Sequence, residues 1–250
     1  MPAPAAMAVV AMAAATLFVS MAAQAQVRGN AQAEQSRALG ARGQDRALPP
    51  TGRYVSESGE NFIFDRSGAR ALFRFERRAE TWVLRPSPAP RGDIIYRNDA
   101  GDQILRVTPD GGMTLYTVRA PNGTPASMAG IAPALSLPLL GPIRLASLMV
   151  QRSAMLSQAL GRTIIVQLSG EYDEALCTDA LLVTTEAVIR MAGSATLRNK
   201  LARLRSVTIV EGRTSSVAYA NGDLRVTVQP NQGAAGRPSS ARIIRAVAAS

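Results

Sequence analysis

The sequence predicts an α+β fold in which an N-terminal antiparallel β-meander is followed by a β-α-α-β-β segment. Three observations predict it. Apolar and polar residues alternate over short runs between residues 52 and 119, as in half-buried strands. Apolar residues then recur at helical spacing through most of residues 142–205. Beyond residue 206, β-branched runs separated by turn residues return, which indicates further strands.

The first 51 residues are expected to precede the folded part. Met7 to Val19 is an uncharged apolar run, and Ala23-Gln24-Ala25 offers small side chains at the positions that a signal peptidase reads. These features predict that residues 1–25 are a signal peptide and that the mature chain begins at Gln26. The apolar run is too short for a bilayer-spanning helix, so we expect a periplasmic or secreted protein with no transmembrane anchor after cleavage. Residues 26–51, rich in Gln, Ala, Arg and Gly, read as a flexible linker.

Residues 52–119 form the predicted meander. Phe62 and Phe64 share one face of a strand by alternation, as do Phe73 and Phe75 on the next. Turn residues separate these runs, for example Asp65-Arg66-Ser67-Gly68 and Pro109-Asp110-Gly111-Gly112. Five or six short strands are expected, the last of which ends near Val118.

Residues 120–141 contain four prolines and read as a partly buried connector. The α+β segment is predicted over residues 142–229. Pro142 suits the first turn of a helix and Gly161 suits its end. The further elements expected in this segment are a strand at 163–168, helices at 172–192 and 195–205, and strands at 207–210, 216–220 and 224–229.

Asn221-Gly222 between the last two strands is typical of a β-hairpin turn. Residues 230–250 are predicted to be a loop-rich tail, within which residues 242–247 fit either a strand or a helix. The length of the mature chain suits one core or two, so the sequence leaves open whether the meander and the second half share a core.

The composition excludes several chemistries. The chain has 28 Lys and Arg residues against 18 Asp and Glu residues, a formal charge of +10, and no histidine. Without histidine there is no Ser-His-Asp triad, no Cys-His pair and no His-based zinc helix. Cys177 is the single cysteine, so an internal disulfide is impossible. We expect it to be a buried small hydrophobe, with an intermolecular disulfide as the alternative.

Several strand and turn segments carry a resemblance to a known family. They are Phe62-Ile63-Phe64-Asp65-Arg66-Ser67, Leu72-Phe73-Arg74-Phe75-Glu76, Arg85-Pro86-Ser87-Pro88-Ala89-Pro90-Arg91-Gly92-Asp93 and Gly111-Gly112-Met113-Thr114-Leu115-Tyr116-Thr117. They resemble an uncharacterised family of exported bacterial proteins that is defined by a domain of unknown function. The resemblance covers the meander and, less closely, the helices after it. It implies export and implies no reaction, cofactor or site residue.

One basic segment is a candidate binding surface. Leu197, Leu201 and Leu204 share a helical face, and Arg198, Lys200, Arg203 and Arg205 surround them. Such a face suits an anionic envelope component or an acidic protein partner. In the alternative interpretation the leucines are core and the cations are only solvated. Nucleic acid is not expected as a partner, because the chain shows no nucleic-acid-binding motif and export would separate it from that ligand.

No residue set is predicted to be catalytic, cofactor-binding or metal-ligating. Glu171, Asp173, Glu174 and Asp179 cluster at a helix start, where acidic residues are favoured in any helix. A carboxylate pair from this cluster, or Lys200 with a serine such as Ser194, remains the basis of an alternative reading as a His-independent hydrolase of an envelope polymer. A third reading is a small-ligand carrier lined by the aromatic residues of the meander.

The function expected from the sequence is a non-catalytic binding or interaction protein of the cell envelope. Its partner and its oligomeric state stay open. Unpaired Cys177 and exposed strand edges of the meander are the features that would favour association.

Overall fold

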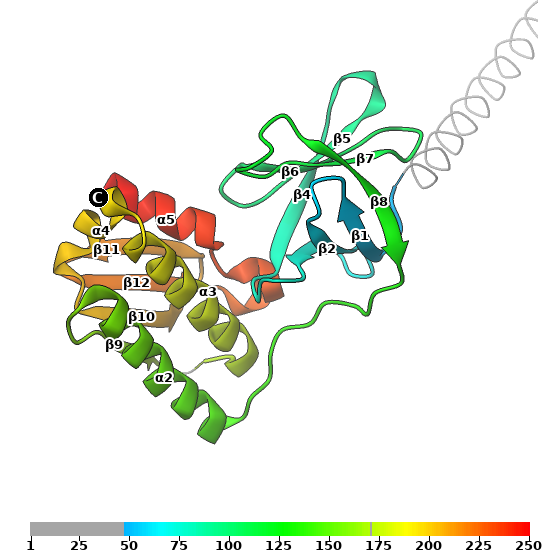
Figure 1. The fold of residues 1–250 in the computed structure, drawn as a ribbon. Helices are drawn as coiled ribbons and strands as arrows, with labels where there is room; N and C mark the ends of the chain where they lie inside the picture. The colour runs from blue at the N-terminus through cyan, green and yellow to red at the C-terminus, as the bar shows by residue number, and fades with distance from the viewer. Residues whose placement is uncertain (1–47, 171) are drawn as a thin grey trace, which may run out of the picture. The chain divides into compact units, whose positions relative to one another are not determined.

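Two separate hydrophobic clusters organise the folded part of the chain. The computed structural model describes residues 48–170 and 172–250, so the predicted signal peptide and nearly all of the predicted linker lie outside the described residues. One cluster fills a β-barrel and the other lies between a four-stranded sheet and its helices (Figure 1). The α+β fold is confirmed, and the question of one core or two is answered as two.

The meander closes into an eight-stranded barrel. Its strands are β1 (Gly52–Ser56), β2 (Asn61–Asp65), β3 (Ala71–Phe75), β4 (Trp82–Pro88), β5 (Ile94–Arg97), β6 (Gln103–Val107), β7 (Met113–Leu115) and β8 (Thr124–Gly130), with the short 3-10 helix η1 (Pro90–Gly92) between β4 and β5. Each strand is antiparallel to the next, and β8 pairs with β1. Closure removes the free strand edges that the sequence suggested as a route to association. The closing strand, β8, lies inside the range predicted as connector.

Aromatic side chains fill the barrel. Phe62, Phe64 and Phe73 are fully buried. The rings of Phe62 and Phe73 stack with their centroids 4.9 Å apart, and Trp82 stacks on Phe73 at 5.7 Å. Stacked and edge-to-face pairs at these distances are the favourable arrangements for aromatic rings. The alternating aromatic residues of the sequence therefore form the packed core of the barrel.

The chain between β8 and the second half packs on the outside of the barrel. Ala132 and Leu135 form a small apolar cluster with Ile63 of β2. The backbone N–H of Leu135 also donates to Oδ2 of Asp65 over 2.7 Å. The partly buried connector of the sequence analysis is thus residues 131–141, after β8.

The second half contains the helices and a four-stranded sheet. Its elements are α2 (Pro142–Leu160), β9 (Ile165–Ser169), α3 (Glu174–Ala192), α4 (Ala195–Lys200), the 3-10 helix η2 (Leu201–Arg203), β10 (Ser206–Glu211), β11 (Ser216–Ala220), β12 (Asp223–Val228), the 3-10 helix η3 (Pro230–Gly236) and α5 (Ser240–Ala249). The strand order is β11-β12-β10-β9. β10 is parallel to β9 and β12, and β11 is antiparallel to β12.

The range predicted as a loop-rich tail ends in helix α5. The hydroxyl of Ser239 caps it by accepting from the N–H of Arg242, as an N-cap serine should. Ile243 and Val247, one helical turn apart, are fully buried against the second core. Of the strand and the helix that the sequence left open for residues 242–247, the helix is therefore correct.

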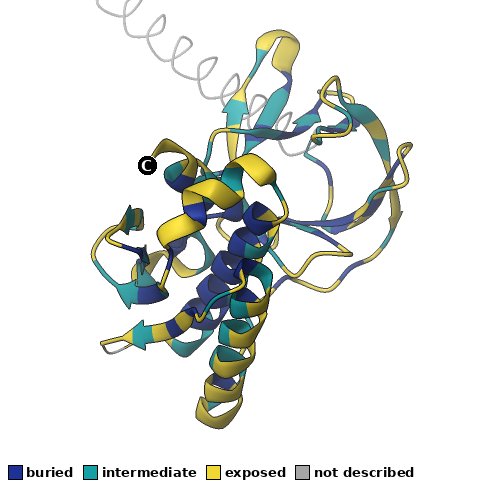
Figure 2. Ribbon diagram, turned by 60° about the vertical axis from the view of Figure 1, so that its left-hand side comes forward, coloured by how far each residue is buried: buried dark blue, intermediate teal, exposed yellow. Residues whose placement is uncertain are grey.

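Helices α2, α3 and α5 cover the same face of the sheet. Alternate strand residues such as Val207 and Ile209 belong to the core that the helices share. Helix α3 lies over β10 and β12 and is the most buried helix in Figure 2. The opposite face is polar: Oδ1 of Asp223 accepts from the hydroxyls of Ser206 and Thr208, each over 2.7 Å. Within the described residues, we find no helix with the length and apolarity needed to cross a lipid bilayer.

Helix α2 protects the β9 edge of the sheet. The N–H of Val166 donates to Oγ of Ser153 over 2.9 Å, and the N–H of Ile164 donates to Oγ of Ser157 over 2.8 Å. Both serines come from α2 and lie one helical turn apart. Since an edge strand otherwise exposes such N–H groups to a second chain, covering them with a helix is a means of preventing edge pairing.

Candidate functional site

The four cations predicted to contact a partner lie together at the surface. Arg198 and Lys200 belong to α4, Arg203 to η2, and Arg205 precedes β10. All four side chains are exposed. We call them the basic surface.

The leucines between these cations face inward. Leu201 and Leu204 are fully buried and Leu197 packs against the same core. This part of the alternative interpretation is therefore correct: the apolar face of the segment is core, and it is not available to a partner.

In the part of the chain that the structure describes, the cations of the basic surface have no acidic side chain as a partner. Among residues 48–170 and 172–250, none of the four forms an ion pair with an Asp or Glu. Lys200 donates from Nζ to the backbone oxygen of Ser250 over 2.8 Å. Behind the segment, Nε of Arg162 donates to the carbonyl of Leu204 over 3.0 Å, and its Nη2 donates to that of Leu201. The backbone is thus anchored, and among the described residues the three arginines form no ion pair.

The acidic cluster of the sequence is used by the fold. Asp173 caps α3, with Oδ1 accepting from the N–H of Leu176 over 2.9 Å. Oε1 of Glu174 accepts from the N–H of Leu140 over 2.9 Å and so ties the connector to α3. Asp179 is buried elsewhere along the helix and pairs with Arg237, and Glu171 lies outside the described residues. The described carboxylates of this cluster therefore do not meet at one point.

A buried ion cluster joins the two halves, and the sequence analysis missed it. Arg237 follows η3 and its side chain is 2% exposed. It donates to Asp179 of α3 and to the carbonyl of Thr81, which precedes β4, and Oε1 of Glu80 lies 3.9 Å from its Nη1. We call Glu80, Asp179 and Arg237 the clamp. No local pattern marks these residues, because they stand 58 to 157 positions apart in the sequence.

The clamp balances two buried carboxylates against one guanidinium. Burial raises the pKa of the Asp179 carboxyl, and the nearby Arg237 guanidinium opposes that rise. Glu80 is held in addition by Ser240, whose N–H and hydroxyl donate to its carboxylate over 2.8 and 2.6 Å. The two carboxylates thus depend on one guanidinium for their neutralisation.

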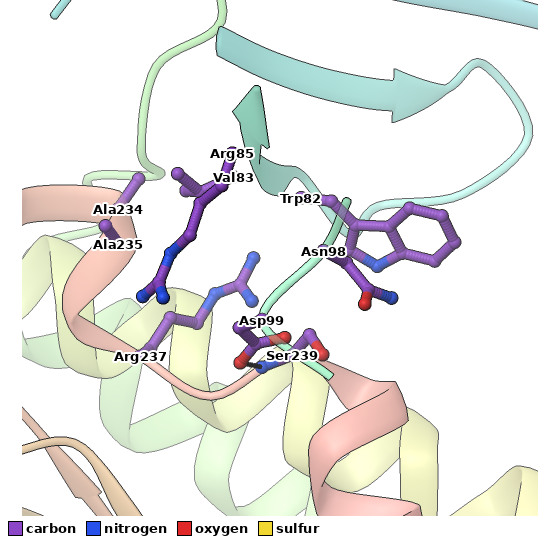
Figure 3. Close-up of a pocket in the computed structure, with 9 residues that line it drawn as sticks. All are labelled: Trp82, Val83, Arg85, Asn98, Asp99, Ala234, Ala235, Arg237 and Ser239. Atoms are coloured by element: carbon purple, nitrogen blue, oxygen red, sulfur yellow. Dashed lines mark hydrogen bonds between the residues drawn. The ribbon is translucent and has the colours of Figure 1, made fainter. Parts of the chain in front are cut away.

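A small cavity lies beside the clamp (Figure 3). Arg85 and Arg237 point into it from opposite sides, with Trp82 and Asp99 on its wall. Trp82 Nε1 and Asp99 Oδ1 are buried without a hydrogen-bond partner among the described residues. The cavity volume is about 20 Å³, enough for one water-sized group and far below the roughly 300–1,000 Å³ of ligand pockets. Its size does not suit a polymer substrate or a metabolite.

Cys177 is a structural residue. Its side chain is fully buried in the second core. Burial, with smaller effects from the carboxylates of Glu211 and Asp173, raises the pKa of Cys177 to about 12. A buried thiol that stays protonated is a poor nucleophile and cannot reach a second chain, so the intermolecular disulfide is excluded and the small-hydrophobe interpretation holds.

Comparison with known proteins gives a family and no activity. No curated protein and no solved structure is significantly similar to the chain. A family model described as a domain of unknown function (DUF4908) matches residues 30–247. The match extends well past the meander and includes the basic surface and the clamp. It confirms the resemblance noted from the strand and turn segments: the chain belongs to the DUF4908 family.

Proposed function

We propose that this protein is an exported, non-catalytic binding protein of the cell envelope whose basic surface contacts an anionic partner. The observation that carries the proposal is that Arg198, Lys200, Arg203 and Arg205 are exposed together, and that no acidic side chain in the described part of the chain pairs with them. Because their segment is anchored by buried leucines and by Arg162, an anion meets a surface that is already organised.

Three of these four cations are arginines, which matters for the class of partner. A guanidinium presents a planar set of donors that matches phosphate and carboxylate oxygens in pairs. The net charge of +10 adds long-range attraction toward any polyanion. We therefore expect a phosphate-bearing or carboxylate-bearing envelope component, bound with an affinity that falls as salt rises.

Vesicle binding tests the basic surface. Neutralising all four residues (R198Q/K200Q/R203Q/R205Q) should weaken binding to phosphatidylglycerol vesicles at low salt by at least about tenfold, since each cation near an anionic surface contributes about 1 kcal/mol. The measurement is co-sedimentation, with phosphatidylcholine vesicles as the uncharged reference.

A matched variant separates position from net charge. R77Q/R78Q/R91Q/R119Q removes four exposed arginines from the barrel and should change binding by no more than about twofold. Equal losses in the two variants would show that only the net charge of the protein matters and would contradict a defined surface.

Export is tested by the mass of the endogenous protein. The periplasmic fraction should contain a species that begins at Gln26, because the small residues before it form the expected cleavage site. Intact-mass spectrometry of separated periplasmic and cytoplasmic fractions makes the distinction. A full-length species confined to the cytoplasm would remove the envelope from the proposal and leave only anionic partners of the cell interior.

A further inference from the structure

The two edges of the four-stranded sheet differ. At one edge, Ser153 and Ser157 of α2 occupy N–H groups along β9. At the other edge stands β11, which pairs with β12 alone. Within the described residues no second strand lies beside β11 (Figure 1). The fold thus covers the β9 edge with α2. At the β11 edge, Arg242 of α5 donates to Ser215 just before the strand, and no described strand pairs with β11 on its outer side.

The hairpin shows which groups of β11 are free. Asn221 and Gly222 both have positive φ, 52° and 82°, as a two-residue hairpin turn requires. Such a turn is closed by a hydrogen-bonded pair, here Ala220 with Asp223. Bonded pairs alternate along an antiparallel ladder, so Ala218 and Ser216 also bond to β12. Val217 and Tyr219 therefore direct their N–H and C=O groups outward.

The side chains of β11 do not obstruct this edge. Ser216, Ala218 and Ala220 are exposed and small. The strand carries no charge and no proline, and its register with β12 is regular. Charges, prolines and bulges are the usual means of blocking edge pairing, and β11 has none of them.

We propose that β11 pairs with β11 of a second copy of this chain, antiparallel and about a two-fold axis at Ala218. In this register Val217 of each copy stands opposite Tyr219 of the other, and all their outward groups are paired. Ala218 then faces its own counterpart in a non-hydrogen-bonded pair, where the Cα atoms lie only about 4.5 Å apart. A small side chain suits that position.

The register supports an antiparallel second copy. A two-fold axis at Ala218 places Val217 of one copy opposite Tyr219 of the other, so the outward backbone groups of both strands are used in pairs. Because the β9 edge is capped in both copies, the joined sheet ends at eight strands and the assembly is a closed dimer.

Cysteine cross-linking at the axis tests the register. The variant A218C should form a covalent dimer under mild oxidation by oxidised glutathione, since the expected Cα separation lies within the range of disulfides. Cys177 does not compete, because it is fully buried. A220C is the matched control: the two introduced thiols would be four residues out of register, roughly 13 Å apart, beyond the reach of a disulfide.

The oligomeric state in solution tests whether the two copies associate at all. The wild-type protein should be dimeric by analytical ultracentrifugation. A218R should be monomeric with an unchanged circular dichroism spectrum, because Ala218 is exposed and two arginines at the axis repel. A monomeric wild-type protein, or cross-linking of A220C as fast as that of A218C, would overturn the proposal. This inference does not depend on the basic surface, and each can fail without the other.

Discussion

Replacing Arg237 by methionine is expected to lower the free energy of unfolding by about 3–5 kcal/mol, because removing one partner leaves buried charges uncompensated. The substitution preserves much of the side-chain volume and removes the charge. Asp179 and Glu80 would then share a buried site without a cation. The connection between α3 and the chain before β4 would also lose the hydrogen bond to Thr81.

Urea unfolding at pH 7 measures this loss, followed by the fluorescence of Trp82. Trp82 is the only tryptophan, and it lines the cavity beside the clamp. R245M is the matched control: Arg245 also pairs with a barrel carboxylate, Asp102, but the two side chains are 58% and 40% exposed, and such pairs contribute about 0–1 kcal/mol. Equal effects of the two substitutions would contradict a special role for the clamp.

The destabilisation caused by R237M should also depend on pH in a defined direction. Burial raises the pKa of Asp179 in the folded protein, so the folded state holds that proton more tightly than the unfolded state does. Stability from such a group is present below the unfolded pKa and is lost as pH rises through the folded pKa. The substitution removes the guanidinium that opposes this rise. The loss of unfolding free energy in R237M, relative to the wild type, should therefore be smaller at pH 4 than at pH 7. An equal loss at the two pH values would argue against uncompensated carboxylates.

In the double variant S153A/S157A, each substitution is expected to lower the free energy of unfolding by about 1–3 kcal/mol. This is the cost of leaving a buried donor without an acceptor. The N–H groups of Val166 and Ile164 would lose their partners along the β9 edge. Thermal unfolding of the double variant against the wild type measures the sum.

Ser147→Ala is the control on the same helix. Its hydroxyl donates to the carbonyl of Ile143, and the residue is exposed. The substitution should therefore change the free energy of unfolding by no more than about 0.5 kcal/mol. A double variant as stable as S147A would show that water replaces the two hydroxyls, and that α2 does not protect this edge.

Most helices and strands were predictable because their determinants are local. Pro142 and Gly161 bound α2 as expected, and Asn221-Gly222 forms the turn between β11 and β12. The exposure of Arg198, Lys200, Arg203 and Arg205 around buried leucines likewise follows from helical spacing. In each case the residues that decide the structure lie within a few positions of one another.

Strand β8 was not predictable, because nothing in its own residues requires a strand. It contains Pro125, and its exposure does not alternate cleanly. It is a strand because β1 and β7 bond to it and close the barrel. Helix α5 lay within the predicted tail for a similar reason: its apolar positions, Ile243 and Val247, are few, and they matter only against the second core.

The sequence by itself thus determined the α+β class, the order of most elements and the basic surface, since periodicity, turn residues and caps act over a few residues. Only the tertiary structure decided the closure of the barrel, the division into two cores, the clamp and the difference between the β9 and β11 edges. These features join residues far apart in the chain, such as Glu80 with Arg237 and Ser153 with Val166. Their energies arise from burial and backbone pairing, which exist only after distant segments have met.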